Sequence, residues 1–209
     1  MATAAETATG NQIECSPLLL DLYYEFFHAA HPCVLPRAQL DLFLARDELC
    51  PLVRVICYIG SLFSASVSSE DRKQEVQDTL AGIRARVRPI TSLDAQAVLL
   101  YSIAVYWSNE PEYGTILLDE AVEMAVELGM NHKEFATSHG EGNPVLEESW
   151  RRTWWLFYIT DAHIAGSTHA FPFRTSRIHQ TVDLPCEEHE YETGVIFTAF
   201  LYLQHLDTD

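Results

Sequence analysis

Residues 146–161 read LEESWRRTWWLFYITD, and this stretch decides the fold. Large side chains recur along it at helical spacing, so two adjoining faces of one helix carry aromatic rings. Those faces hold Trp150, Trp154, Phe157 and Tyr158, with Trp155, Ile159 and Ala162 beside them. So many rings must pack against several neighbours. The pattern therefore predicts a core helix from residue 145 to about residue 164.

The same stretch opens with carboxylates that precede arginines. Glu147 and Glu148 fall in the first turn, where negative charge opposes the positive end of the helix dipole. Each stands four residues before an arginine, Arg151 or Arg152, in the order that favours pairing. We expect these arginines to pair with carboxylates at the boundary of the core. If the Glu148–Arg152 pair is exposed, it contributes only about 0.3–0.5 kcal/mol.

Helical patterns continue on both sides of this segment. Ser68 and Thr91 each stand three residues before an aspartate, which is capping-box spacing, and Gly129 suits the left-handed residue that ends a helix. Residues 136–144 and 166–190 are expected to be loops because they are polar or rich in turn residues. The expected helices are 17–31, 40–45, 51–63, 68–86, 95–107, 111–128, 145–164 and 193–206.

The sequence shows neither a convincing alternating strand nor a repeat that survives its whole length. It predicts an all-α fold with about seven or eight helices packed as antiparallel pairs in a single compact domain. The helices at 95–107 and 111–128 are the clearest such pair. Residues 1–15 are expected to be a flexible leader, and residues 16–209 the helical domain.

Charge argues against a nucleic-acid-binding protein. The 209 residues carry 30 acidic and 13 basic side chains, for a net charge of −17, which repels phosphate backbones. Most of the excess acid falls in residues 109–150 and 178–209, whereas residues 54–88 and 151–177 are slightly basic. The basic stretches are expected to face acidic ones, within the fold or in a partner.

No signature of catalysis or metal binding is complete. The sequence has no nucleophile elbow, no phosphate-binding loop and no HExxH zinc motif. Cys186 and His189 are spaced as two zinc ligands, but a tetrahedral site needs three or four and no second pair is near. We therefore expect no catalytic residue, no cofactor and no metal in this chain. Without a secretory signal or a membrane-length apolar run, the chain is expected to be soluble and intracellular.

Three motifs in order carry a resemblance to a known family. The run EESWRRTWWLFYITD at 147–161 is followed by FPFR at 171–174 and DLP at 183–185. The preceding helix, GTILLDEAVEMAVELGMNHKEF at 114–135, and the opening YYEFFHAAHPCVLP at 23–36 agree with it. Together they resemble the middle homology region of fungal binuclear zinc-cluster transcription factors, over most of residues 20–185.

The resemblance implies a helical regulatory domain of a nuclear transcription factor. It implies protein partners in the transcription machinery or a full-length family member, and a small-molecule effector as a further partner. Its motif residues, with structural or regulatory roles, fall here on Gly129, Glu148, Arg151, Arg152, Trp154, Trp155, Asp161, Pro172, Asp183 and Pro185.

The sequence departs from this family at both ends. The family reads DNA with a separate six-cysteine module that holds zinc, whereas this chain has five cysteines and no CxxC spacing. Zinc is thus expected only in the missing module, and no direct DNA binding is expected from this chain. The family region also continues through several more helices beyond the DLP turn, so we expect a C-terminally incomplete domain.

Three hypotheses of function follow. The first is a regulatory or interaction domain that influences transcription without reading DNA. The second is a small-molecule-binding helical protein, with a pocket formed by the rings of Trp107, Trp150, Trp154, Trp155 and Tyr158. The third, an enzyme, has no positive feature in the sequence. A nucleic-acid stacking platform at the rings is disfavoured because few basic residues surround them.

Overall fold

A helix that is apolar on every face has to lie in the interior, and α5 (Ser92–Trp107) does. In the computed structural model, which describes residues 16–196, residues 94–105 of this helix are all buried. The predicted capping box starts it: the Thr91 hydroxyl accepts from the Asp94 amide at 3.2 Å, and the Asp94 carboxylate accepts from the Thr91 amide at 2.9 Å. Arg88 neutralises the buried Asp94 carboxylate at 2.7 Å.

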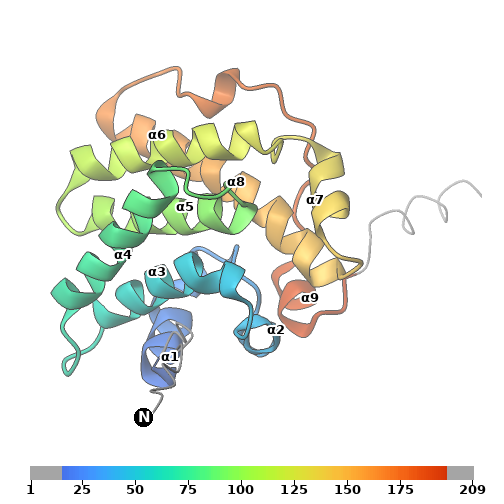
Figure 1. The fold of residues 1–209 in the computed structure, drawn as a ribbon. Coiled ribbons are helices and arrows are strands. Elements are labelled where there is room, and N and C mark those ends of the chain that lie inside the picture. The colour runs from blue at the N-terminus through green and yellow to red at the C-terminus, as the bar shows by residue number, and fades with distance from the viewer. Residues whose placement is uncertain (1–15, 197–209) are drawn as a thin grey trace, which may run out of the picture.

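The described residues form nine α-helices, three short 3-10 helices and no strand, which confirms the all-α prediction (Figure 1). The elements are α1 (Pro17–Phe26), η1 (His28–Ala30), α2 (Arg37–Phe43), η2 (Asp47–Leu49), α3 (Cys50–Ser61), α4 (Ser69–Arg84), α5 (Ser92–Trp107), α6 (Pro111–Glu127), α7 (Lys133–His139), α8 (Pro144–Thr168), η3 (Thr175–Arg177) and α9 (Glu188–Thr193).

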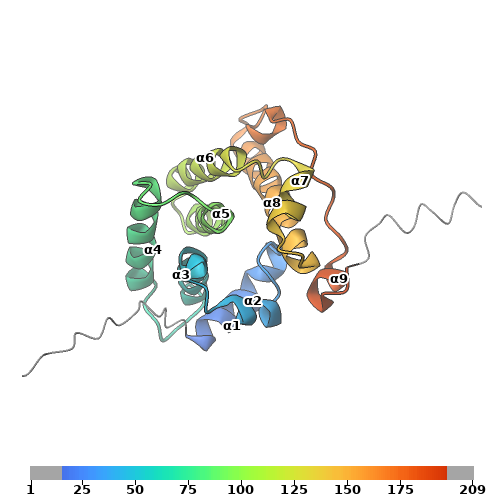
Figure 2. The ribbon, with the colours of Figure 1, turned by 45° about the vertical axis from the view of Figure 1, so that its right-hand side comes forward.

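Two buried helices organise the packing. Helix α3 contacts α1, α4 and α5, and helix α5 in turn contacts α6 and α8. Figure 2 shows α3 and α5 near the middle of the view, with α4, α6, α8 and α1 around them. The short α7 packs on the N-terminal part of α8. The long aromatic helix therefore lies against the most buried part of the structure.

Helices α5 and α6 form the predicted antiparallel pair and make the most extensive helix contact in the structure (Figure 1). Gly114 permits their close approach, because a Cβ atom built there would lie 2.8 Å from the Tyr106 backbone. Real Cβ atoms do not come that close to another backbone, so this position requires glycine.

The loop predicted at residues 136–144 is wrong over its first half. Helix α7 spans Lys133–His139, because Phe135 and Ala136 find buried positions in the core and the His139 ring stacks on Phe135 at 4.0 Å. Their burial outweighs the polar composition that suggested a loop. The chain leaves the helix at Gly140, and only residues 140–143 connect it to α8.

The C-terminal helix also differs from its prediction. The sequence predicts a helix at 193–206, whereas Thr193 is the last residue of α9 (Glu188–Thr193) and Gly194 follows it in the left-handed conformation, at φ 71°. The acidic first turn of α9, which contains Glu188 and Glu190, lies within the expected loop. Residues 197–206 of the predicted helix and the leader at 1–15 lie outside the described residues.

Candidate functional site

The motif helix α8 starts at a polar cap and runs further than expected. The Asn143 side-chain oxygen accepts hydrogen bonds from the amides of Val145 and Leu146, at 3.0 and 3.4 Å, and Pro144 occupies the first helical position. The helix ends only at Thr168, four residues beyond the predicted end, with His169 in the left-handed conformation. Along its length, α8 contacts both α5 and α7.

Glu148 is the acidic centre of the motif. Its side chain is 1% exposed, and its two oxygens contact Arg151 Nε at 2.8 Å and Arg152 Nε at 3.0 Å. One of these oxygens also accepts from the backbone amide of Cys186 at 2.8 Å. The sequence predicts two parallel pairs, but Glu147 reaches Arg151 only at 3.8 Å. Both arginines instead share Glu148.

Arg152 connects three separate parts of the chain. Its guanidinium donates to Glu188 on α9 at 2.6 Å, to the Cys186 carbonyl at 2.9 Å and to the Pro32 carbonyl at 3.4 Å. It also lies over the ring of Tyr191, 4.2 Å from the ring centre. The Glu148–Arg152 pair is therefore buried, and the low energy given above for an exposed pair does not apply. The segments around Pro32 and Cys186 cover it and leave only 6% of the Arg152 side chain exposed.

The charges of this cluster are held by mutual pairing. Burial by itself lowers the pKa of Arg152, but hydrogen bonds and charge from Glu188 and Glu148 outweigh burial and raise it. Burial and the nearby Glu148 charge raise the pKa of the Cys186 thiol to about 11. At neutral pH the arginine is thus charged and the thiol is protonated. This arrangement stabilises the fold and activates neither group for chemistry.

The tryptophans tie α8 to the segment that follows it. Trp154 is fully buried, and its Nε1 donates to the side-chain oxygen of Gln180 at 2.6 Å. Trp155 is half-buried, and its Nε1 donates to the Asp183 carbonyl at 2.9 Å. These two hydrogen bonds hold residues 180–183 against α8.

The rings do not line one common pocket, so that part of the second hypothesis is wrong. Trp154 and Phe157 pack within the core, 6.4 Å apart, whereas Trp107 is 65% exposed. Trp107 borders a small cleft of about 160 Å³, and Trp150 borders a different cavity. Close packing around Trp154 is the reason: the neighbouring side chains fill the space that a ligand would need.

The remaining motif residues are spread over the molecule. Asp161 accepts hydrogen bonds from the amide and the hydroxyl of Thr175, at 2.6 and 2.8 Å, and so fixes the start of η3 to α8. Gly129 ends α6 at φ 78°, and the Met130 amide donates back to the Ala125 carbonyl at 2.9 Å.

Pro172, Asp183 and Pro185 lie exposed on the segment after α8. The structure therefore brings Glu148, Arg151 and Arg152 together and joins Trp155 to the Asp183 carbonyl. The other motif residues lie in separate places.

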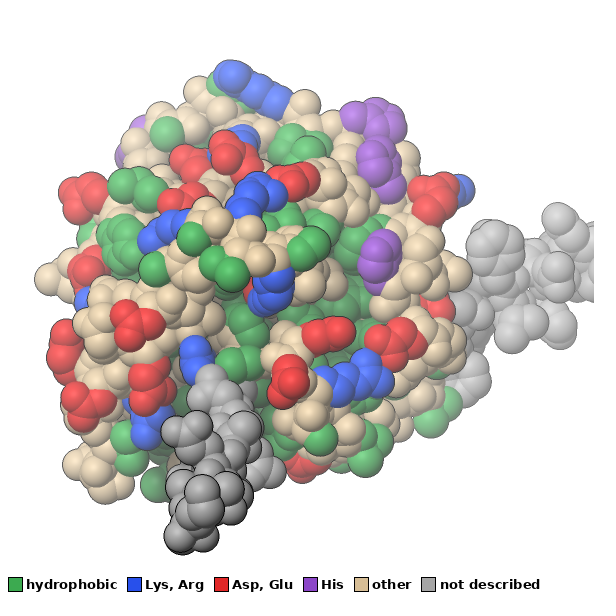
Figure 3. All heavy atoms as spheres, in the orientation of Figure 1, with side chains coloured by type: hydrophobic (Ala, Val, Ile, Leu, Met, Phe, Trp, Pro, Cys, Tyr) green, Lys and Arg blue, Asp and Glu red, His purple; other side chains and the backbone are tan. Residues whose placement is uncertain are grey.

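Arginines of the basic stretches form ion pairs with carboxylates of the acidic helix α6. On the acidic helix α6, Glu120 pairs with Arg84 at 2.8 Å, Glu127 with Arg86 at 2.7 Å, and Glu123 with Arg174 at 3.0 Å. Basic stretches therefore face acidic ones within the fold. On the face shown in Figure 3, basic side chains lie scattered among acidic ones and do not gather into a patch.

The described residues show neither a metal cluster nor a membrane-spanning helix. Within residues 16–196, no group of three or more His, Cys, Asp or Glu side chains is placed to hold a metal ion. In that part of the chain, none of the helices combines the length and the apolar character needed to cross a membrane.

Residues 20–203 match the family described as the fungal specific transcription factor domain. The chain belongs to this family. Among curated proteins, the C6 finger domain transcription factor iacK of Pestalotiopsis fici is 32% identical over 190 residues. No solved structure matches the chain.

The match covers the two proteins unequally. It takes in 91% of this fungal transcription factor domain but only 28% of the length of the Pestalotiopsis protein. The resemblance read from the tryptophan–arginine motif is confirmed by the family match, whose range includes every motif residue.

Sequence reasoning missed the partners that bury the motif. Glu188 and Tyr191 complete the surroundings of Arg152, and the Tyr191 hydroxyl donates to the Val34 carbonyl at 2.9 Å. A signal was present: three carboxylates, at Glu187, Glu188 and Glu190, precede Tyr191, and Gly194 follows as a helix stop. Acidic first-turn residues with a terminal glycine are the pattern of a short helix.

Proposed function

We propose that this chain is a regulatory domain that influences transcription through contacts with other proteins and does not itself read DNA. The observation that carries the proposal is the family match over residues 20–203. The relative with the matching region is named a C6 finger transcription factor, and the CxxC spacing of such a finger is absent from this sequence. Its partners are proteins of the transcription machinery or a full-length family member, in the nucleus.

The structure supports a non-catalytic role. The most unusual side chains of the sequence, in the stretch 147–155, are engaged in packing and ion pairs that hold the fold. The thiol in this cluster, Cys186, has its pKa raised to about 11 by burial, which disfavours the reactive thiolate. Residues 16–209 are proposed to act as one helical domain without enzyme activity.

A tethering assay tests the regulatory role. The whole chain is fused to a heterologous DNA-binding module whose operator lies upstream of a reporter gene. We expect transcription to rise or fall relative to the module alone at matched protein levels. The same fusion carrying Trp154→Ala should lose the effect, because the core no longer packs. A reporter level equal to that of the module alone would contradict the proposal.

A binding measurement tests the claim about DNA. Fluorescence anisotropy of a labelled duplex is followed while the purified chain is added at about 0.15 M salt. With a net charge of −17 and arginines already paired to carboxylates, we expect no binding tighter than about 10⁻⁴ M, the weak end of non-specific association. Tight, sequence-selective binding would overturn the claim.

A further inference from the structure

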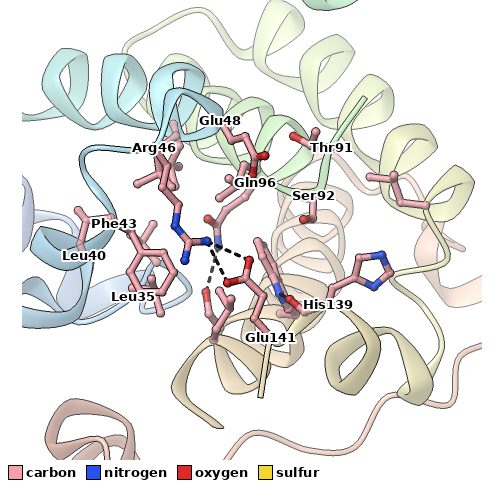
Figure 4. A pocket seen from close by; sticks show the side chains of 18 of the residues that line it. Leu35, Leu40, Phe43, Arg46, Glu48, Thr91, Ser92, Gln96, His139 and Glu141 are labelled. Carbon is pink, nitrogen blue, oxygen red and sulfur yellow. Dashed lines mark hydrogen bonds and ion pairs between the residues drawn. The ribbon is translucent and has the colours of Figure 1, made fainter. Parts of the chain in front are cut away.

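A cavity of about 390 Å³ lies between α2, the start of α5, α7 and the N-terminal part of α8 (Figure 4). Its volume falls within the range of roughly 300–1,000 Å³ that small-molecule sites occupy. Most of its wall is apolar and includes Val34, Leu40, Phe43, Leu52, Leu146 and Trp150. The cavity is separate from the Glu148–Arg152 cluster, whose side chains do not line it.

One buried polar side chain in the wall has an unused acceptor. Gln96 of α5 is 1% exposed, and its Nε2 donates to Thr153 Oγ1 at 2.7 Å and to the Cys33 carbonyl at 3.1 Å. Its side-chain carbonyl oxygen accepts no hydrogen bond from any residue that the structure describes. Gln96 lines the cavity, and an amide oxygen there can accept a hydrogen bond from a bound molecule. Gln96 therefore offers an acceptor to a donor group inside the cavity.

The charges of the wall indicate the charge of the occupant. Arg46 contacts both oxygens of Glu141, at 2.9 and 3.0 Å, and is thereby neutralised. Glu48 remains, so the lining carries a net negative charge. The other polar residues of the lining include Ser92, Ser149 and His139. The negative charge of the lining repels an anion, whereas it does not repel an uncharged molecule.

The ion pair also closes one side of the cavity. In Figure 4 the Arg46 and Glu141 side chains point toward one another across the cavity, from the segment after α2 and from the turn between α7 and α8. Their side chains are 43% and 53% exposed. Exposed pairs contribute only about 0–1 kcal/mol, so this contact opens easily.

We propose that this cavity binds an uncharged, mainly apolar small molecule that donates a hydrogen bond to the side-chain carbonyl of Gln96. The molecule enters where the Arg46–Glu141 pair parts. The apolar wall supplies the affinity, and the amide oxygen selects a hydroxyl or an N–H group. This site stands apart from the proposed regulatory role, so failure of either proposal leaves the other intact.

A set of matched probes tests the chemistry of the site on the unaltered chain. We would titrate 2-naphthol, which is neutral and carries one hydroxyl donor, and follow binding by calorimetry and by amide chemical shifts. Saturable binding at one site is expected. We expect 2-methoxynaphthalene, which has no donor, to bind roughly 2–10-fold more weakly, as for one lost hydrogen bond. The 2-naphthoate anion should bind more weakly than 2-naphthol.

Two substitutions place the site. Leu93, half-buried in the first turn of α5, lines the cavity, and Leu93→Trp should fill it and weaken 2-naphthol binding roughly tenfold or more. The matched control is Leu42→Trp on α2, where the leucine is 74% exposed, and it should bind as the wild type does. Circular dichroism verifies that both variants fold.

Three outcomes would overturn the proposal. These are no saturable 2-naphthol binding by the wild-type chain, equal binding of 2-naphthol and 2-methoxynaphthalene, and wild-type affinity in a folded Leu93→Trp variant. The first two need no substitution, so they decide the matter even if that variant does not fold.

Discussion

Trp154 shows how one side chain of α8 serves the core and the following segment together. Its ring is fully buried, and its Nε1 donates to Gln180 at 2.6 Å. Burial of the nitrogen therefore leaves no donor unpaired. The periodicity of the sequence predicted the burial of this residue, but the hydrogen-bond partner comes from a segment 26 residues away that has no helical pattern.

Trp154→Ala should lower the free energy of unfolding by about 3–5 kcal/mol, because it empties a large packed site in the core. Urea unfolding followed by circular dichroism measures the loss. Trp155→Ala is the matched control, since Trp155 is only half-buried and loses one hydrogen bond, and it should cost about 1 kcal/mol. Equal losses in the two variants would show that Trp154 has no special place in the core.

His28 predicts a dependence of stability on pH. Burial, with smaller contributions from Arg152 and His31, lowers its pKa from 6.5 to about 4. The neutral ring packs on Tyr24 at 4.7 Å, and the Glu192 carboxylate lies 3.5 Å from its Nε2.

Because its pKa is lower in the folded chain, the unfolded chain binds the proton more readily, and stability is lost as pH falls from about 6.5 toward 4. The expected loss is about 2 kcal/mol between pH 7 and pH 5.

The measurement compares the pH dependence of urea unfolding in the wild type and in His28→Phe. The phenylalanine keeps the packing but cannot titrate, so its stability should change less over this range. Burial also raises the pKa of Glu192, which acts in the opposite direction as pH falls toward 4.5. Both proteins contain Glu192, so the difference between their pH profiles reports His28. Identical pH profiles would contradict the role given to His28.

At the scale of the helices, the α5–α6 pair depends on Gly114. We expect Gly114→Ala to destabilise the chain by about 1–3 kcal/mol, because the new Cβ atom overlaps the Tyr106 backbone at 2.8 Å. The helical preference of alanine over glycine, about 1 kcal/mol, acts the other way and is outweighed.

Gly82→Ala supplies the control for the measurement of thermal unfolding. Gly82 lies within α4, and no atom lies within 4 Å of a Cβ built there. The same substitution should therefore stabilise the chain by about 0.5–1 kcal/mol. If both variants shift the unfolding temperature in the same direction, the close approach at Gly114 is not what fixes the pair.

The elements also show how far sequence patterns reach. The capping residues Ser68 and Thr91, the C-terminal Gly129 and the uniformly apolar α5 depend on local interactions, and the structure has a helix end or a buried helix at each place. The sequence did not predict the bounds of helices α7 and α9. Both are short and gain their stability from tertiary burial of Phe135 and Tyr191.

At the scale of the molecule, the sequence indicated the all-helical class but not the contacts between distant segments. Arg152 meets Pro32 across 120 positions and Glu188 across 36, and no periodicity encodes such pairs. The cavity lined by Gln96 could not be predicted from the sequence for the same reason, since α2, α5, α7 and α8 each supply part of its wall. The sequence motif indicated the family, and the structure showed which contacts the motif residues make.

The central claim is that the tryptophan–arginine motif holds the domain together from inside. Arg152 joins α8 to the segment at Pro32 and to α9, and its side chain is 6% exposed. Removal of one partner from a buried ion pair costs about 3–5 kcal/mol, because the other charge is left unpaired. The lower end is expected here, because Glu188 is 55% exposed and can be hydrated when the arginine is lost.

The most direct test is urea unfolding of Arg152→Met beside Arg84→Met, which removes an exposed ion pair to Glu120. We predict that Arg152→Met loses about 3 kcal/mol of unfolding free energy, while Arg84→Met loses about 0–1 kcal/mol. If Arg152→Met unfolds at the wild-type urea concentration, the motif is not an internal scaffold and the account is contradicted.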